Sequence, residues 1–416
     1  MTKPQYKRLL FENRNLLGFG CLMTFYSSIG QTYMVGVFGP SIQADFGLSH
    51  TTWGTMFMIG TLASGAVLTW SGSLIDRFRL PVYALSVCGL IVAACGLTAL
   101  VSGPVGLVLC IFLLRHSGQG LASHTAMISM TRYFVRNRGR AIAIASLGGT
   151  VGKAILPFLA LVSITAIGWR WTYGWFGIII AITSIPTILR LLRGWGELHR
   201  AHHKRFDVKD SEDNSASSWS RQQVLRDPRF YLMLPGLVAP GFIGTALFFH
   251  HLNIADAKGW EASWITGNYV IYAMVIVVSQ LASGALVDRF SASSVVQFML
   301  IPLVAALILI GFADHHLWFI PYMIILAIHW SMVANSTSAI WPELYGVGHL
   351  GAIKSMHFAL AVVFSAFGPV IFGILIDHEL SIRNICLLAA TYAILCNVVL
   401  VLTLRTVKKE QGQFSS

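Results

Sequence analysis

Apolar stretches long enough to cross a lipid bilayer recur along the whole chain and alternate with short polar connections. A transmembrane helix needs about 20 predominantly apolar residues. By this measure we predict spans at residues 16–40, 53–75, 81–101, 105–133, 139–163, 171–192, 230–254, 262–287, 293–312, 317–341, 351–376 and 382–404. The pattern therefore predicts an all-α membrane protein with about twelve transmembrane helices.

The composition supports lipid as the main solvent. Of the 416 residues, 55% are hydrophobic and only 11% are charged, whereas a soluble domain carries about 25% charged residues. The basic residues behind the net charge of +12 recur between apolar stretches rather than in one patch, which argues against a nucleic-acid partner. The 6 cysteines all fall inside apolar stretches, without the spacing of a disulfide framework or a zinc site.

A long polar segment at residues 193–228 separates the first six predicted spans from the last six. Its centre, residues 209–218, is polar and lacks hydrophobic periodicity, which is typical of a mobile linker. We predict an N-terminal six-helix bundle at 1–192, a cytoplasmic linker at 193–228 and a C-terminal six-helix bundle at 229–416.

The basic residues indicate on which side of the membrane each connection lies. Most of the 29 Lys and Arg residues fall at the two termini or in the connections after even-numbered spans. Only Arg170, Lys258 and Arg383 fall in the other connections, while Arg115 and Lys153 lie within spans. Because cytoplasmic connections carry the excess of Lys and Arg, we predict a multi-pass protein of the cell (inner) membrane with both termini in the cytoplasm.

The two halves share a repeated segment. Residues 72–78 read Gly-Ser-Leu-Ile-Asp-Arg-Phe, and residues 284–290, which begin 212 positions later, read Gly-Ala-Leu-Val-Asp-Arg-Phe. Pro157 in the fifth span and Pro369 in the eleventh lie at the same offset. Two landmarks at one offset indicate a duplication, so the two bundles are expected to be pseudo-symmetric.

This paired Gly-x-x-x-Asp-Arg segment resembles the signature loop of the major facilitator superfamily of secondary transporters, and the resemblance extends over nearly the whole chain. Residues 115–120, Arg-His-Ser-Gly-Gln-Gly, are similar to a second family motif, with three residues rather than two between Arg and Gln. A glycine-rich fifth span that ends in Pro157 is a third similarity. The resemblance implies the major facilitator fold, with two six-helix bundles that alternate access to a central site.

Within the superfamily, the chain most resembles the bacterial group related to monocarboxylate and oxalate/formate carriers. Residues 38–40, Phe-Gly-Pro, and residues 349–353, His-Leu-Gly-Ala-Ile, carry this resemblance. That group often has a charge in the eighth span, whereas residues 268–284 here contain Gln280 but no charged residue. The second half of the group's binding site is therefore not transferred to this chain.

The resemblance also implies a gating role for Asp76, Arg77, Asp288 and Arg289. In the family, contacts at this loop latch the halves together in the outward-facing state. A carboxylate there can accept hydrogen bonds at a helix N-terminus, and the arginines can pair with acids or lipid phosphates. The simpler interpretation is that the arginines only follow the positive-inside rule.

Arg115 and Lys153 are the main candidate substrate-binding residues. A charge at the bilayer centre costs at least about 2.5–3.5 kcal/mol, so it usually faces protein or a water-filled cavity. Spans four and five run in opposite directions, and each places its cation near mid-depth. No carboxylate lies at that depth in the first half of the sequence, so we expect the two cations to attract an anion. The alternative for Arg115 is a structural bond to backbone carbonyls or to Gln119.

Four further polar side chains complete the predicted substrate-binding site: Gln31, Gln119, His329 and His357. Gln31 lies at mid-depth in the first span, and Gln119 follows Arg115 in the fourth. The two histidines lie in spans ten and eleven, where either could carry a proton because His titrates near neutral pH. A hydrogen-bonded core role fits either histidine equally well.

These features predict secondary active transport of a small organic anion such as a monocarboxylate, with protons as the simplest coupling ion. Efflux of hydrophobic compounds and uptake of a vitamin- or siderophore-like solute are alternatives. A non-transporting receptor on a transporter fold also stays open. No enzyme activity and no cofactor are expected, because the sequence lacks an ATP-binding loop, a nucleophile motif and a metal-ligand cluster. The expected partners are the solute, protons and membrane lipids, and the chain is expected to be a monomer.

Overall fold

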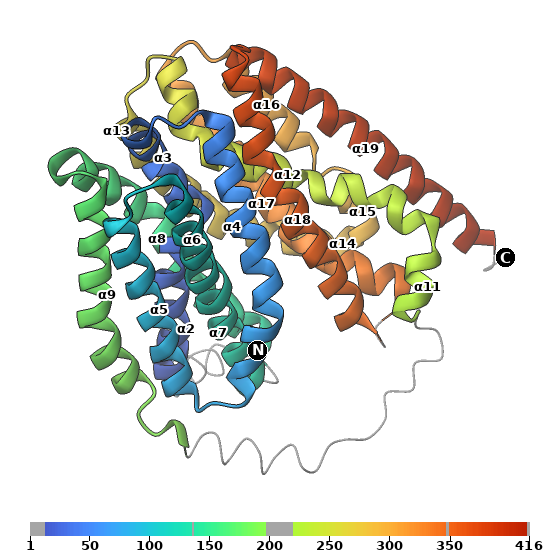
Figure 1. Ribbon diagram of the computed structural model, residues 1–416. Coiled ribbons are helices and arrows are strands. Elements are labelled where there is room, and N and C mark those ends of the chain that lie inside the picture. Colours follow the sequence, from blue (N-terminus) through green and yellow to red (C-terminus); the bar gives the residue numbers. More distant parts are fainter. Residues whose placement is uncertain (1–12, 135–136, 197–218, 347–348, 414–416) are drawn as a thin grey trace. The chain divides into compact units, whose positions relative to one another are not determined.

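The computed structural model describes residues 13–134, 137–196, 219–346 and 349–413 (Figure 1). Within these ranges every regular element is helical. Eleven helices of the described chain are long and apolar enough to cross a membrane. The prediction of an all-α membrane protein with about twelve transmembrane helices is confirmed.

The first predicted span is interrupted rather than continuous. Helix α2 (Arg14–Ser27) passes into the 3-10 turn η1 (Ser28–Gly30), and helix α3 (Thr32–Phe46) begins after it. Between them Gln31 has an extended backbone, with φ −78° and ψ 152°. At about 1.5 Å per residue, neither α2 nor α3 alone reaches across a hydrocarbon core of about 30 Å. This interruption explains why the first span is not among the eleven helices.

The chain divides into two compact units. The first comprises Met1–Gly47 and Ile59–Glu212, and the second comprises Leu48–Met58 and Asp213–Ser416. The division after residue 212 falls inside the predicted linker at 193–228, of which residues 197–218 lie outside the described residues. The first turns of helix α4 (His50–Ser71) thus belong to the second unit and the rest of α4 to the first.

In the first unit, the longest helices lie side by side (Figure 1). After α4 the elements are η2 (Gly72–Asp76), α5 (Leu80–Leu100), α6 (Pro104–Leu114), η3 (Arg115–Ala122), α7 (Ser123–Tyr133), α8 (Arg138–Ile167) and α9 (Trp169–Leu191). Helix α2 packs along α8, and α5 packs along α9. The α2–α8 contact depends on glycine, because a Cβ at Gly148 would lie 1.8 Å from the carbonyl oxygen of Cys21. Small residues let membrane helices approach this closely.

The second unit repeats this packing. Its elements are α11 (Arg221–Arg226), α12 (Pro228–Ala257), α13 (Ala262–Gly267), α14 (Tyr269–Phe290), α15 (Ala292–Val296), α16 (Ile301–Phe312), η4 (His316–Trp318), α17 (Phe319–Tyr345), α18 (Leu350–Asp377) and α19 (Ile382–Gln413). Helix α12 packs along α18, and α16 packs along α19. These pairs correspond to α2–α8 and α5–α9 in the order of predicted spans, as a duplication requires.

The start of α4 is held by a carboxylate of α18. The side chain of Asp377 accepts hydrogen bonds from the backbone N–H groups of His50, at 3.0 Å, and Thr51, at 2.8 Å. A negative charge at this position is favourable because the N-terminus of a helix carries a partial positive charge. This bond lies within the second unit.

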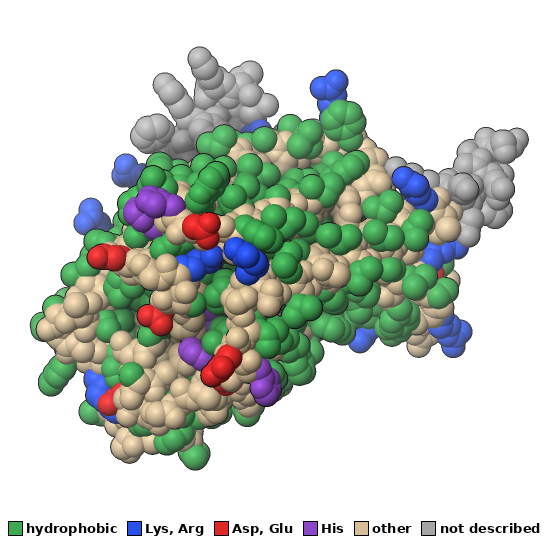
Figure 2. All heavy atoms as spheres, turned by 90° about the horizontal axis from the view of Figure 1, so that it is seen from above, with side chains coloured by type: hydrophobic (Ala, Val, Ile, Leu, Met, Phe, Trp, Pro, Cys, Tyr) green, Lys and Arg blue, Asp and Glu red, His purple; other side chains and the backbone are tan. Residues whose placement is uncertain are grey.

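The surface is unusually apolar for a protein of this length. Large hydrophobic side chains are exposed on many helices, among them Trp70, Ile182, Val278 and Leu281. Figure 2 shows one face on which hydrophobic side chains cover broad areas, while acidic and histidine side chains lie mostly in one part of it. Exposed apolar surface on this scale is expected where lipid, not water, surrounds the helices.

Candidate substrate-binding site

The interruption of the first span creates a polar position inside the first unit. A break in a helix leaves backbone carbonyl groups without partners inside that helix, and the carbonyl of Gly30 is one of them. Gly30 itself is required there, because a Cβ would lie 2.0 Å from the carbonyl oxygen of Leu114 on α6. The fourth span therefore passes directly against the break.

Arg115 closes the break from the fourth span. Its NH1 group donates to the carbonyl oxygen of Gly30 at 3.1 Å and to the hydroxyl of Thr32 at 3.2 Å. Its Nε donates to the hydroxyl of Thr61 on α4 at 3.1 Å. The side chain is only 2% exposed, so a full positive charge is buried among neutral oxygen atoms. This geometry includes the backbone contact that was the structural alternative for Arg115.

The backbone around Arg115 is also unusual. Residues Arg115–Ala122 form η3, a π-helical segment between the α-helices α6 and α7. Within η3, Gly118 approaches Gly30 so closely that a Cβ would lie 2.6 Å from the Gly30 nitrogen. Widened π turns in membrane and soluble helices often occur at functional sites.

Lys153 reaches the same short segment from α8. Its Nζ lies 4.9 Å from the centroid of the Tyr33 ring, within the range of a cation–π interaction. The preceding residue, Gly152, brings α8 against η1, because a Cβ there would lie 2.1 Å from Ser28 Oγ. Arg115 and Lys153 therefore contact two consecutive residues of α3, Thr32 and Tyr33.

A comparison with known families identifies this architecture. Residues 20–361 match the model of the Major Facilitator Superfamily. The chain belongs to this superfamily. It is accordingly a multi-pass membrane transporter of small molecules and not an enzyme.

Two curated relatives of this facilitator are distant. The uncharacterized MFS-type transporter YcxA of Bacillus subtilis (strain 168) is 23% identical over 337 residues, which cover 78% of each chain. The probable sulfoacetate transporter SauU of Cupriavidus necator (strain H16) is 30% identical over 211 residues. That match covers 50% of this chain and 44% of the relative, so the chain matches less than half of the relative's length.

Solved transporters share the fold of this facilitator. A bacterial homologue of the human lysosomal transporter Spinster, in an inward-facing and unoccupied conformation, is 15% identical with a TM-score of 0.67. That match covers 95% of this chain and 98% of the other. The nucleoside transporter NupG is 13% identical with a TM-score of 0.69, over 94% of this chain and 99% of the other. The predicted major facilitator fold is thereby confirmed.

The remaining predicted substrate-binding residues lie in both units of the facilitator. Gln31 is the extended residue of the break, and Gln119 lies in η3, where its backbone nitrogen would be 2.9 Å from a Cβ at Gly30. Both side chains are half-buried. The structure thus brings Gln31 and Gln119 to the same break as Arg115 and Lys153.

His329 and His357 belong to the second unit. His329 on α17 is fully buried, and its Nδ1 donates to the carbonyl oxygen of Met299 at 2.7 Å. His357 on α18 is half-buried, with its ring centroid 5.2 Å from that of Trp341. The contacts of His329 match the hydrogen-bonded core role. Substrate contact by either histidine stays a prediction.

The predicted gating residues have different surroundings in the two units. Asp76, at the end of η2, forms an ion pair with Arg132 in the last turn of α7. At the repeat offset, Arg132 corresponds to Leu344, which cannot form such a pair. Arg77, Asp288 and Arg289 are exposed, and the guanidinium of Arg289 lies 5.2 Å from the Phe290 ring centroid. Their gating role stays a prediction.

In the second unit a different acid holds the corresponding junction. The carboxylate of Glu343 on α17 accepts hydrogen bonds from the backbone N–H groups of Ala292, at 2.7 Å, and Ser293, at 3.2 Å. Neither Arg132 nor Glu343 was singled out from the sequence. Both lie far from the two loops in sequence, and their place at the ends of the predicted spans four and ten was the available signal.

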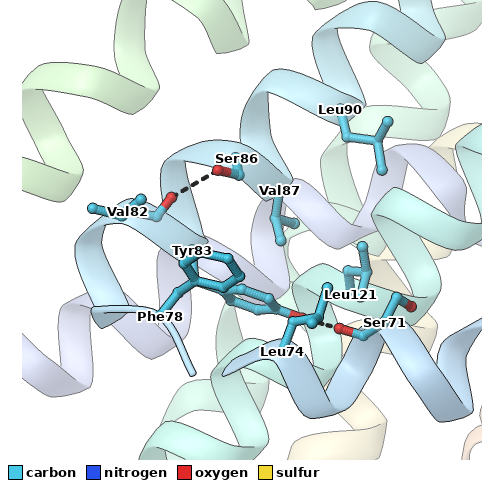
Figure 3. A pocket seen from close by; sticks show the side chains of 9 residues that line it. All are labelled: Ser71, Leu74, Phe78, Val82, Tyr83, Ser86, Val87, Leu90 and Leu121. Carbon is cyan, nitrogen blue, oxygen red and sulfur yellow. Dashed lines mark hydrogen bonds between the residues drawn. The ribbon is translucent and has the colours of Figure 1, made fainter. Parts of the chain in front are cut away.

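A pocket beside the first gating loop is unsuited to an anion. It is partly open, has a cavity volume of about 210 Å³ and lies between the end of α4, α5 and η3 (Figure 3). Its lining residues are Ser71, Leu74, Phe78, Val82, Tyr83, Ser86, Val87, Leu90 and Leu121. They include no charged group, and the hydroxyl of Tyr83 already donates to the carbonyl oxygen of Ser71 at 3.1 Å. An apolar chain fits this lining better than a carboxylate.

Proposed function

We propose that this facilitator is a secondary active transporter of a small organic anion, and that the anion binds at the break in the first span. The observation that carries the proposal is that Arg115 and Lys153 contact the consecutive residues Thr32 and Tyr33. Two cations at one position inside membrane-length helices create a positive potential, which favours an anionic solute.

The two cations have different parts in this proposal. Arg115 is fixed by three hydrogen bonds to neutral oxygen atoms, so it supplies a stationary positive field. Lys153 lies with its ammonium group over the Tyr33 ring face, and an ammonium is a compact point charge whose N–H groups suit the oxygen atoms of a carboxylate or sulfonate. Lys153 is therefore the proposed direct ligand, and Gln31 and Gln119 provide neutral polar contacts beside it.

One of the two relatives favours the same class of solute. SauU is named a probable sulfoacetate transporter, and sulfoacetate carries a sulfonate and a carboxylate. The sequence resemblance to monocarboxylate and oxalate/formate carriers points in the same direction. We propose a small carboxylate or sulfonate as the substrate class, with protons as the coupling ion.

We further propose that transport proceeds by alternating access of two six-helix bundles, 1–192 and 229–416, with both termini and the linker in the cytoplasm. The distribution of Lys and Arg supports this orientation. In this arrangement the loops with Asp76, Arg77, Asp288 and Arg289 face the cytoplasm and act as the inner gate.

Counterflow in proteoliposomes tests the proposed function. Liposomes with the purified protein are loaded with unlabelled sulfoacetate and diluted into labelled sulfoacetate at equal pH on both sides. We expect uptake of labelled sulfoacetate to depend on the internal load. Lactate and oxalate should inhibit this uptake by competition, and a neutral nucleoside should not affect it. Competition by the nucleoside but by no anion would contradict the proposed substrate class.

A further inference from the structure

A buried histidine in the second unit lies between two tyrosine hydroxyls. His251 on α12 has its Nδ1 2.8 Å from the hydroxyl of Tyr269 and its Nε2 2.8 Å from the hydroxyl of Tyr322. The imidazole is 2% exposed, and both phenol rings are buried as well. We name these three residues the His–Tyr cluster.

The His–Tyr cluster can hold the imidazole in both of its charge states. A neutral imidazole has one N–H donor and one acceptor nitrogen, whereas the protonated ring has two donors. A phenol hydroxyl can either donate or accept. When a proton binds at the acceptor nitrogen, the tyrosine that donated to it turns its O–H away and accepts instead. Both hydrogen bonds persist, so protonation leaves neither ring nitrogen without a partner.

Aromatic rings surround the same imidazole. The ring centroids of Phe248 and Phe319 lie 5.0 Å and 5.6 Å from that of His251. Those of Tyr269 and Tyr322 are both at 5.7 Å. Aromatic rings within about 6 Å stabilise a cation through their quadrupoles, and cages of such rings are a recurrent way to hold one. The surroundings of His251 therefore favour a positive charge more than an aliphatic core would.

The other two buried histidines of the second unit are arranged differently. His250 has Nε2 2.9 Å from the carbonyl oxygen of Pro369, which can only accept, and Nδ1 2.8 Å from the amide nitrogen of Asn253, which can only donate. His329 donates from Nδ1 to a carbonyl, and its Nε2 is buried without a hydrogen-bond partner in the described structure. A second proton on either ring would face an N–H group or no acceptor at all, which is costly in a buried site.

The titratable groups around the cluster are mostly uncharged near neutral pH. Tyr272 on α14 and Cys386 on α19 lie near Tyr322, together with Tyr269. Lys258, which follows α12, acts electrostatically on Cys386 and donates to the carbonyl oxygens of Gly311, at 3.3 Å, and Ala313, at 2.7 Å. Partial burial lowers the pKa of Lys258, and Asp314 and Arg383 act on it with opposite signs.

We propose that His251 binds the coupling proton of this transporter. The proton adds to the acceptor nitrogen of the imidazole from water on one side of the membrane and leaves to water on the other, and no other bond forms or breaks. The inference rests on the proposed anion transport, because one proton carried with a monoanion makes the transfer electroneutral. It assigns the coupling site to the second unit, whereas the anion site lies in the first.

Comparison of exchange with accumulation tests the proposal. In proteoliposomes clamped at zero membrane potential, exchange of sulfoacetate at equal pH requires no net proton movement. Accumulation under a gradient of one pH unit can rise up to about tenfold for each coupled proton, because one unit corresponds to about 1.36 kcal/mol. We expect His251→Gln, which can donate and accept but cannot titrate, to exchange like the parent and to lose this tenfold accumulation.

The adjacent histidine supplies the matched control. His250→Gln, at an equally buried position one residue earlier, should keep the pH-driven accumulation. Tenfold accumulation by His251→Gln, or equal losses in both variants, would overturn the proposal.

A measurement without substrate separates this proposal from the proposed function. In protein with 15N-labelled histidine, the ring signals are recorded as a function of pH. The signal of His251 is identified as the one that is missing from His251→Gln, and it should titrate in the parent. Tyr322→Phe keeps the imidazole but removes one hydrogen bond, so that signal should titrate at lower pH. If the parent exchanges none of the anions, the proposed substrate class fails while this titration still decides the role of His251. If no signal assigned to His251 titrates, or Tyr322→Phe leaves its titration unchanged, the proton site is wrong.

Discussion

The NH1 group of Arg115 lies 3.1 Å from the carbonyl oxygen of Gly30, so a side chain of the fourth span completes the hydrogen bonding of the first. This bond makes the break in the first span a stable feature, because the freed carbonyl has a charged donor. The same side chain then contributes its charge to the position where Lys153 arrives from α8. Structural support and a candidate binding role thus meet in one residue.

Replacement of Arg115 by Gln should destabilise the protein. A hydrogen bond to a charged group contributes about 1.5–3 kcal/mol, and the Gly30 carbonyl would lose its charged donor. We expect a lower unfolding temperature in detergent and a smaller loss for Arg115→Lys, which keeps the charge but not the planar fork of donors. Unfolding of Arg115→Gln at the temperature of the parent would show that this bond does not hold the break.

Replacement of Lys153 by Met should abolish stabilisation by anions. If Lys153 is the direct ligand, loss of its ammonium group should weaken sulfoacetate binding about 10- to 100-fold, as expected for the loss of about 1.5–3 kcal/mol. Lys153→Arg should keep part of the effect. The shift of the unfolding temperature with increasing sulfoacetate measures it.

Ser146→Ala is the control for Lys153→Met, because Ser146 is exposed on the same helix and its hydroxyl donates to the carbonyl oxygen of Ile142 in that helix. It should respond to sulfoacetate like the parent. If Lys153→Met also does so, Lys153 only packs against Tyr33 and the anion proposal loses its main support.

Two adjacent glycines of α8 should differ sharply in their tolerance of alanine. A Cβ at Gly148 would lie 1.8 Å from a backbone oxygen of α2, whereas a Cβ at Gly149 would lie 3.5 Å from the nearest atom, an ordinary contact. Gly148→Ala should therefore separate α2 from α8 and lower the unfolding temperature by several degrees, while Gly149→Ala should not lower it. Equal behaviour of the two variants would contradict the close α2–α8 packing.

Loss of the Asp76–Arg132 ion pair should impair turnover more than binding. Asp76 is exposed and Arg132 is half-buried, so the contribution of this surface pair to stability is expected to be only about 0–1 kcal/mol. Asp76→Asn and Arg132→Gln should slow exchange in proteoliposomes to similar extents and leave the sulfoacetate-dependent unfolding shift intact. A variant that lost binding but kept its remaining turnover would argue against gating by this pair. Leu344→Ala, at the equivalent place in the second unit, is the control.

Reporter fusions should show that both halves of the chain end on the cytoplasmic side of the membrane. We expect fusions after Asp210 and after Ser416, two positions outside the described residues, to read cytoplasmic, because Lys and Arg concentrate in the connections on that side. A fusion after Lys258, which lies in one of the opposite connections, should read external. A cytoplasmic reading at Lys258 would reverse the proposed topology.

The sequence predicted the fold well because the bilayer itself constrains it. Lengths of apolar stretches report the thickness of the hydrocarbon core, and the repeat of Asp76–Arg77 at Asp288–Arg289 reported the duplication. The length rule counts residues 16–40 as one span and so does not reveal the break at Gln31. The short polar run at residues 27–32, Ser-Ser-Ile-Gly-Gln-Thr, was the available signal.

Partners between distant elements were the least predictable part of the site. Depth along the spans suggested that Arg115 and Lys153 lie at similar levels, but not that both contact α3, because depth gives no rotation about a helix axis. The acceptor at Gly30 was not predictable either, because it is a backbone carbonyl oxygen, which every residue has. The sequence shows that Arg132 in the first half is replaced by Leu344 at the equivalent position of the second. The importance of this difference became apparent only from the contact of Arg132 with Asp76.

The two junctions also differ in how the solvent acts on them. The Asp76–Arg132 pair joins an exposed carboxylate to a half-buried guanidinium, and dissolved salt weakens surface ion pairs increasingly as the ionic strength rises. Glu343 instead binds two backbone N–H groups at short range, where mobile ions compete less. A rise in ionic strength therefore weakens one junction and largely spares the other. The equivalent junctions of the two halves therefore differ in their expected dependence on the ions of the medium.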